Sequence, residues 1–108
     1  VYKRQLLHRL MAEKDQDAFS LFGMIIRQFR LLLLAKEHLT TGGSPGSVAG
    51  ALGIKPYPAQ KLAQQSRTFS VEQLERILRS LLDYDVKMKT GRIDPDLALD
   101  LFVASVSK

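Results

Sequence analysis

One long apolar segment constrains the fold of this chain more than any other feature. It spans residues 18–35 and reads AFSLFGMIIRQFRLLLLA. Its length would suit a membrane span, but Arg27, Gln28 and Arg30 interrupt it near the middle. Each central arginine opposes insertion by roughly 2.5 to 3.5 kcal/mol. We therefore reject a membrane span and predict a helix that is apolar on most sides and enclosed at the centre of a helical bundle.

The boundaries of the first helices follow from capping residues and glycines. A short helix is predicted over residues 3–13, where leucines and a methionine recur at helical spacing. Asp15 or Asp17 can cap the long apolar helix, which we expect to end just before Gly42 and Gly43. The glycine-rich loop that follows leads into a pair of short helices.

The C-terminal part of the chain carries the clearest helix signals. Ser70 and Gln73 form a capping box, in which each side chain can bond a free backbone amide of the other residue. Gly91 supplies a left-handed stop for that helix. Asp94 followed by Pro95 is a cap with proline at the first helical position, and it predicts the start of the last helix.

The spacing of apolar residues predicts which helix faces are buried. In the helix that follows Ser70 the buried stripe is predicted to be Leu74, Ile77, Leu78, Leu81, Leu82 and Met88. In the last helix it is Leu97, Leu101 and Ala104, widened by Ala98 and Phe102. The most enclosed side chains should include Leu21, Ile25, Phe29, Leu32, Leu33, Leu74, Leu78 and Leu81. Hardly any alternating pattern indicates a strand, so we predict an all-α, bundle-like domain of five or six helices without a sheet.

Length and composition limit the domain count and the kinds of site. With 108 residues, 45% of them hydrophobic and 25% charged, residues 1–108 are expected to form a single ordered domain. The chain has no cysteine, which excludes disulfides and thiolate metal sites. The net charge of +5 is spread along the chain, so it is only a weak sign of an acidic partner or nucleic acid. Because the sequence does not begin with methionine, we expect it to be part of a longer protein.

No pattern of residues points to catalysis, a cofactor or a metal. His8 and His38 are far apart in sequence, and neither has a carboxylate three or four residues further on that would build a metal site. The glycines of the loop at residues 42–46 do not form the phosphate-binding signature GxxxxGK[ST], and no GxSxG nucleophile elbow occurs. The sequence therefore predicts a non-catalytic domain.

The stretch SPGSVAGALGIKPYPAQKLAQQSR, residues 44–67, allows two interpretations. Its small and apolar residues fall where a DNA-binding helix-turn-helix needs them: Val48, Ala49, Leu52, Gly53, Ile54, Ala59 and Leu62. The second helix would then offer Gln60, Lys61, Gln64, Gln65 and Arg67 to DNA. Any closely crossing helical hairpin needs the same small residues, however, and we favour a packing hairpin over a DNA reader.

Asp85 is expected to need a charged partner. It lies four residues after Leu81 and therefore on the apolar stripe of its helix, where an unpaired carboxylate is costly. Arg27 and Arg30, one turn apart on the long helix, could meet it through a guanidinium fork, with Asp83 as the fallback acid. Two interpretations remain, an arginine pair that binds a partner or phosphate, and an internal ion pair that fixes helix register. We favour the internal ion pair.

Three spaced motifs give the chain a resemblance to a known family. They are RQFR at residues 27–30, LGIKPYPAQKLAQQSRTFS at residues 52–70, and LLDYDVKMKTG at residues 81–91. In this order they resemble the C-terminal domain of the delta subunit of the bacterial DNA polymerase III clamp loader. The residues that carry the resemblance are Arg27, Gln28, Phe29 and Arg30; Leu52, Gly53 and Pro56; Phe69 and Ser70; and Asp85, Lys89 and Gly91.

The resemblance implies a collar domain whose role is subunit assembly. In that family the domain packs beside those of the motor subunits and delta prime, while a separate N-terminal ATPase-like module holds the sliding clamp. It implies a cytoplasmic, non-catalytic domain without cofactor, which meets DNA and the clamp only through the complex. A small DNA-binding helix-turn-helix domain remains the alternative from a different functional class.

Overall fold

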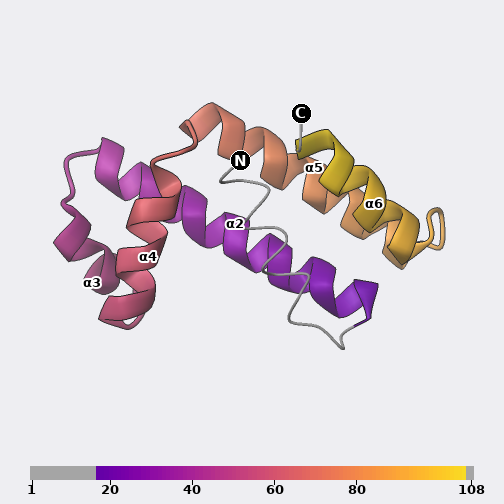
Figure 1. The fold of residues 1–108 in the computed structure, drawn as a ribbon, viewed down its shortest axis with the longest axis horizontal. Coiled ribbons are helices and arrows are strands. Elements are labelled where there is room, and N and C mark those ends of the chain that lie inside the picture. Colours follow the sequence, from indigo (N-terminus) through magenta and orange to yellow (C-terminus); the bar gives the residue numbers. More distant parts are fainter. Residues whose placement is uncertain (1–16, 107–108) are drawn as a thin grey trace. The chain divides into compact units, whose positions relative to one another are not determined.

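The computed structural model describes residues 17–106 of the chain, and this part is all-α (Figure 1). Its elements are α2 (Ala18–Thr40), the 3₁₀ helix η1 (Pro45–Ser47), α3 (Val48–Leu52), α4 (Pro56–Ser66), α5 (Val71–Lys89) and α6 (Pro95–Val106). No strand occurs between residues 17 and 106, which confirms the predicted all-α class. The helix predicted over residues 3–13, with His8, lies outside the described residues.

The helices begin where the capping residues predict. The backbone N–H of Ser20 donates to Asp17 Oδ1 at 2.8 Å, so Asp17 caps α2. At the start of α5, the backbone N–H of Ser70 donates to Gln73 Oε1 at 2.9 Å, and that of Gln73 donates to Ser70 Oγ at 3.0 Å. The carboxylate of Asp94 accepts two backbone N–H groups from the first turn of α6. These side chains satisfy amides that a helix cannot bond internally.

The described residues divide into two compact units. The first unit comprises residues 17–27 and 77–106, and the second comprises residues 28–76. The dividing points fall inside α2 and α5, so each of these long helices contributes one part to each unit. The two units are described in turn below.

Aromatic side chains form the centre of the first unit. Phe22 of α2 is fully buried, and its ring centroid lies 6.1 Å from that of Tyr84 on α5 and 6.2 Å from that of Phe102 on α6. Tilted and edge-on ring pairs at this separation are favourable beyond their area of burial. Phe22 thus joins the three helix segments of this unit. The buried apolar residues here are Leu21, Phe22, Ile25, Ile26, Leu81, Met88, Ala98, Leu99 and Phe102.

The second unit has its own aromatic pair and a tight helical hairpin. The ring centroids of Phe29 and Phe69 lie 5.9 Å apart in an edge-on arrangement. The helices α3 and α4 are in contact, and Gly53 between them has a φ of +68°, a left-handed conformation that glycine adopts without steric cost. The buried apolar residues here are Phe29, Leu32, Ala35, Val48, Ala59, Leu62, Ala63, Phe69 and Leu74.

Most of the predicted core is confirmed. Six of the eight side chains expected to be most enclosed are buried, namely Leu21, Ile25, Phe29, Leu32, Leu74 and Leu81. Leu33 and Leu78 are only half-buried. The prediction that Leu82 belongs to the buried stripe of α5 is wrong, since this side chain is 40% exposed. It lies at the edge of that stripe, one residue beyond the fully buried Leu81.

The buried face of α6 is the main error of the sequence analysis. The predicted stripe of Leu97, Leu101 and Ala104 is exposed, with Leu97 at 50% and Leu101 at 44%. Ala98 and Phe102, predicted to widen the stripe, are buried as expected, and with Leu99 they form the buried face. The physical reason is that α6 is apolar on two opposite faces, so its sequence contains two stripes at helical spacing. Periodicity alone does not say which stripe packs against the core.

Among the described residues, α2 is the helix that is long and apolar enough to cross a membrane by length and composition. The central helix of a water-soluble domain passes the same test. Its arginines, Arg27 and Arg30, are both exposed. The rejection of a membrane span stays a prediction that depends on these two charges.

Candidate functional site

The RQFR motif holds two of its side chains against the rest of the second unit, with Phe29 buried and Gln28 half-buried. Gln28 Nε2 donates to Gln65 Oε1 of α4 at 3.0 Å, and Gln65 is only 7% exposed. The next residue, Phe29, makes the edge-on contact with Phe69. A partly buried amide pair of this kind costs free energy when either partner is removed, because the other amide is left unsatisfied. Gln28 and Phe29 therefore connect α2 to α4 and to the start of α5.

Three further motif residues set the chain direction between helices. Gly53 ends α3 in the left-handed conformation described above, and Pro56 occupies the first turn of α4. Gly91, with a φ of +73°, ends α5, and the backbone N–H of Arg92 donates to the carbonyl of Lys87 at 2.8 Å. The two glycines end helices and the proline begins one, as the sequence predicts.

The structure gives Asp85 a different partner from the predicted arginines. Its carboxylate accepts a 2.8 Å salt bridge from Lys89, one turn further along α5, and the Asp85 side chain is 20% exposed. A lysine four residues away meets the same need as an interhelical arginine, because side chains at this spacing lie on one face. The fallback acid, Asp83, pairs in the same way with Lys87 at 3.0 Å.

The predicted arginines lie on exposed positions of α2. Arg27 belongs to the same unit as Asp85, and the structure does not bring the two into a salt bridge. Arg30 belongs to the other unit, and its pairing with Asp85 stays a prediction. Lys89, a motif residue, is thus the counter-ion that the sequence analysis missed. Its i, i+4 spacing to Asp85 is the signal that could have found it.

The outer face of α4 is polar and basic. Lys61 Nζ lies 5.1 Å from the ring centroid of Tyr57, whose side chain is 66% exposed, so the two form a cation–π contact. Gln60, Lys61, Gln64 and Arg67 are exposed, as a DNA-reading helix would require. Gln65 is buried and bonded to Gln28, so its assignment to that reading surface is wrong.

His38 lies at the end of α2 in a polar contact. Its Nε2 is 2.6 Å from Ser47 Oγ, and a side chain at Gly43 would collide with its imidazole ring.

A hollow of about 670 Å³ lies beside His38 within the second unit, lined by Leu34, Glu37, His38, Thr40, Thr41, Ala51, Leu52 and Val71. Between residues 17 and 106 no group of three or more His, Asp or Glu side chains is placed to hold a metal ion.

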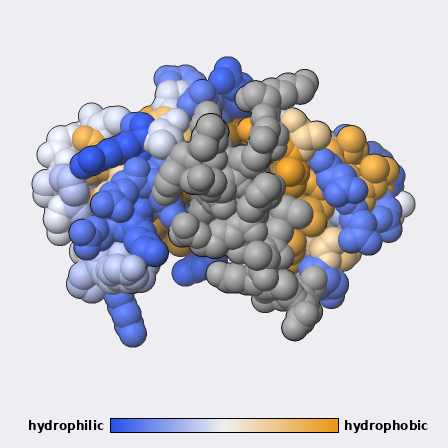
Figure 2. All heavy atoms as spheres, in the orientation of Figure 1, coloured by the Kyte–Doolittle hydropathy of each residue, from blue (hydrophilic) through white to orange (hydrophobic). Residues whose placement is uncertain are grey.

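The outer face of α6 is one of two exposed apolar helix surfaces in the first unit; the other is formed by Leu82 and Val86 on α5. The α6 face carries Leu97 and Leu101, one turn apart, with Asp96 and Asp100 beside them. Figure 2 shows apolar surface at the right of the view, where Figure 1 places α6. Such a surface has no chemistry of its own, and it suits contact with another protein.

Comparison with known proteins shows which family this chain belongs to. Residues 3–106 match the family described as DNA polymerase III delta subunit, C-terminal domain. The chain is 31% identical over 104 residues to the DNA polymerase III subunit delta of Bacillus subtilis (strain 168), covering 96% of this chain and 30% of the relative. The solved Bacillus subtilis DNA clamp loader delta protein matches with a TM-score of 0.82 at 29% identity, over 96% of this chain and 32% of that one. The chain therefore belongs to the family of C-terminal domains of the DNA polymerase III delta subunit.

Proposed function

We propose that this chain is the collar domain of a clamp-loader delta subunit, and that it holds neighbouring subunits together. The observation that carries the proposal is the match to the clamp loader delta protein, which covers 96% of this chain with a TM-score of 0.82. The same comparison gives 29% sequence identity, so the likeness is one of sequence as well as of fold. The leucines exposed on α6 supply contact surface of the kind that subunit assembly needs.

The proposal includes the setting of the domain. The chain spans about a third of the length of the relatives it matches, 30% of the curated one and 32% of the solved one. We propose that residues 1–108 form one collar domain of a longer cytoplasmic protein, whose N-terminal ATPase-like module holds the clamp. The collar domain itself would be non-catalytic and without cofactor. Its partners would be the motor subunits and delta prime, with DNA and clamp reached only through the complex.

The DNA-binding alternative is not favoured by the family or by α4. In that alternative Gln65 would read bases, yet it is bonded to Gln28 inside the second unit. The remaining basic groups of α4 suit weak contact with phosphates, which carries no sequence information. A mobility-shift assay at low and high salt tests this point, because binding driven by phosphate contacts falls steeply as salt rises.

Subunit capture is the direct test of the proposed function. The chain is immobilised and mixed with the purified motor subunit and delta prime of its own source bacterium. We expect it to retain them and to compete with the full-length delta subunit for its place in the complex. A folded chain that retains neither subunit, and that fails to displace delta at large excess, would contradict the proposal.

A further inference from the structure

The last helix has two apolar faces, and only one of them is buried within residues 17–106. Ala98, Leu99 and Phe102 are buried in the first unit. Leu97, Leu101 and Ala104 are spaced by four and three residues, so they form a single line along the opposite side of α6. Leu97 and Leu101 remain 50% and 44% exposed. Exposed apolar side chains that gather on one face of a helix mark a site of contact with another protein.

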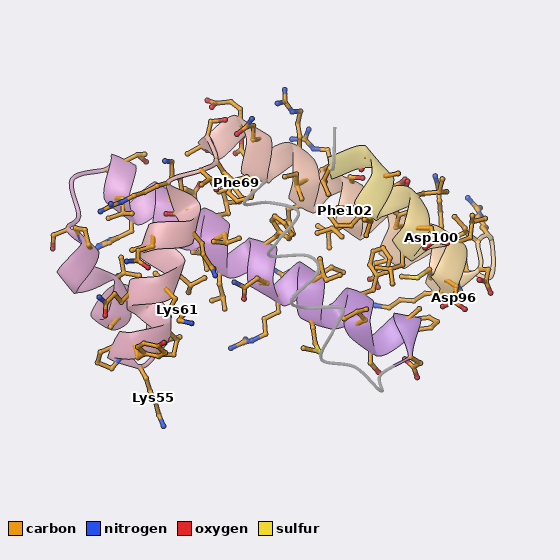
Figure 3. All side chains as sticks on the ribbon, in the orientation of Figure 1. Lys55, Lys61, Phe69, Asp96, Asp100 and Phe102 are labelled. Carbon is orange, nitrogen blue, oxygen red and sulfur yellow. The ribbon has the colours of Figure 1, made fainter. Side chains whose placement is uncertain are left out.

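Two carboxylates border this exposed line. Asp96 and Asp100 lie one turn apart on α6 (Figure 3), which contains no lysine or arginine. The salt bridges found between residues 17 and 106 are the two on α5, so neither aspartate has a cationic partner within that part of the chain. An apolar line beside unpaired acids is complementary to an apolar line beside bases.

The surface continues at the start of α6. A hollow of about 430 Å³ is lined there by Asp17, Ala18, Phe19, Asp94, Pro95 and Asp96, all within the first unit. Phe19 at its edge is 43% exposed. Asp17 and Asp94 are engaged as helix caps. Asp96 therefore borders both the hollow and the exposed leucines, and the outer face of α6 ends in a recess that can receive a side chain.

We propose that this outer α6 face, consisting of Leu97, Leu101, Asp96 and Asp100, is the docking surface for one adjacent clamp-loader subunit. The partner is a helical domain of a different chain, which presents apolar side chains flanked by lysine or arginine. The charge of the face sets this choice, because neither of its two carboxylates has a cationic partner within residues 17–106. A specific interface buries at least about 1,000 Å² in total. Because the centre of an interface is usually apolar and its rim polar, the leucines form the centre and the aspartates belong to the rim. This inference rests on the proposed function.

The test compares two leucines of matched exposure. Leu101 on α6 is 44% exposed and Leu34 on α2 is 46% exposed. We expect Leu101→Asp to weaken binding of the motor subunit or delta prime at least about tenfold, because a charge placed at the centre of an interface removes a principal contact. Leu34→Asp should change binding by less than about threefold. Thermal melting by circular dichroism confirms that both variants are folded.

A charge reversal provides the second measurement. Asp100→Lys adds a cation beside the proposed basic rim, and we expect it to slow association, most clearly at low salt. Glu75→Lys, at an exposed position of α5 in the second unit, is the matched control and should leave the association rate unchanged. Analytical sedimentation of the free chain measures whether it forms a dimer, and so tests whether a second copy of this chain covers the outer α6 face.

The outcomes separate this inference from the proposed function. If the unaltered chain binds no clamp-loader subunit, the proposed function fails first. If it binds and Leu101→Asp and Asp100→Lys bind equally well, the function stands and the α6 face is not the docking surface. If Leu101→Asp instead converts a dimer of the free chain to monomer, the occupant is a second copy and the proposal of a different subunit is wrong.

Discussion

The helices α4 and α6 have nearly the same length, 11 and 12 residues, and opposite surface chemistry. In the second unit, α4 contains no acidic residue, and its buried face includes the polar side chains Gln65 and Ser66. In the first unit, α6 contains no basic residue and is apolar on both faces. The outer side of α4 suits water, whereas that of α6 suits another protein. Within residues 17–106, therefore, α6 leaves an apolar face exposed on its outer side, whereas the outer side of α4 is polar.

The two helices also begin differently. The carboxylate of Asp94 caps α6 by accepting backbone N–H groups at 3.0 and 3.3 Å. Lys55 stands at the cap position of α4 and makes no side-chain cap bond; in Figure 3 it points away from the helix. Pro56 and Pro58 have no backbone N–H, and the backbone N–H of Ala59 donates to the carbonyl of Lys55. The start of α4 therefore leaves one amide, that of Tyr57, which a cap side chain could satisfy.

The largest expected effect separates the two faces of α6. Phe102→Ala removes a fully buried ring that contacts Phe22, and we expect a loss of about 3–5 kcal/mol in the free energy of unfolding. Leu97→Ala, on the outer face, should cost less than about 1 kcal/mol, because little apolar area is lost. Urea unfolding monitored by circular dichroism measures both. Equal losses would mean that the outer face packs within this chain after all.

A smaller effect is expected from the polar interior of α4. Gln65→Ala leaves the half-buried amide of Gln28 without its partner, and we expect a loss of about 1 kcal/mol. Replacing both residues by methionine should recover most of that loss, because no unsatisfied amide then remains. A double-mutant cycle by urea unfolding measures the coupling. Additive losses from the two single variants would show that the hydrogen bond contributes nothing.

Much of the fold was predictable because its signals are local. The caps at Asp17, Ser70 and Asp94, and the glycine stops, depend on residues within one helical turn, and the structure confirms them. The centre of the bundle was predictable for a related reason. The long segment at residues 18–35 has few polar positions, so some of its apolar side chains are buried in almost any packing of the chain. The helix is not enclosed on all sides, however, since Phe19 and Leu34 are exposed.

The remaining features depend on choices that spacing does not make. Two apolar stripes on α6 are equally periodic, and only the contact of Phe102 with Phe22 decides between them. Asp85 had two sources of cations, and the lysine on its own helix is the partner observed. The Gln28–Gln65 bond joins residues 37 positions apart, and no local signal indicates such a contact. The candidate surface on α6 was hidden by the same ambiguity.

The difference in helix starts predicts two opposite changes of unequal size. Lys55→Asp gives α4 an acceptor for the N–H of Tyr57 and a negative charge at the positive end of the helix dipole. Because Pro58 has no N–H to donate, we expect a gain of about 0.5 kcal/mol. Asp94→Ala removes the existing cap of α6, and we expect a loss of about 1 kcal/mol. Melting temperatures measured in the same buffer test both. If Lys55→Asp lowers stability, the start of α4 is already satisfied by other means.

The smallest effect concerns pH and the two kinds of cap. Hydrogen bonds from Ser20, first from its backbone N–H, hold the pKa of Asp17 below its ordinary value of 3.8. A lowered pKa in the folded state means that the ionised carboxylate stabilises the fold above the ordinary pKa, and that this contribution is lost as pH falls through the lowered value. In the second unit, Ser70 caps α5 without titrating.

Asp17→Ser keeps a cap oxygen and removes the titration, so the melting temperature of the unaltered chain should fall towards that of this variant between about pH 5 and pH 2. Ser70→Asp should bring the same pH dependence to α5, since its carboxylate would accept the N–H of Gln73 at the positive end of the helix dipole. The contrary result is a difference in melting temperature between Asp17→Ser and the unaltered chain that stays constant across this pH range. It would show that the charge of Asp17 does not contribute to stability. Acid would then act in the same way on the helix starts of both units.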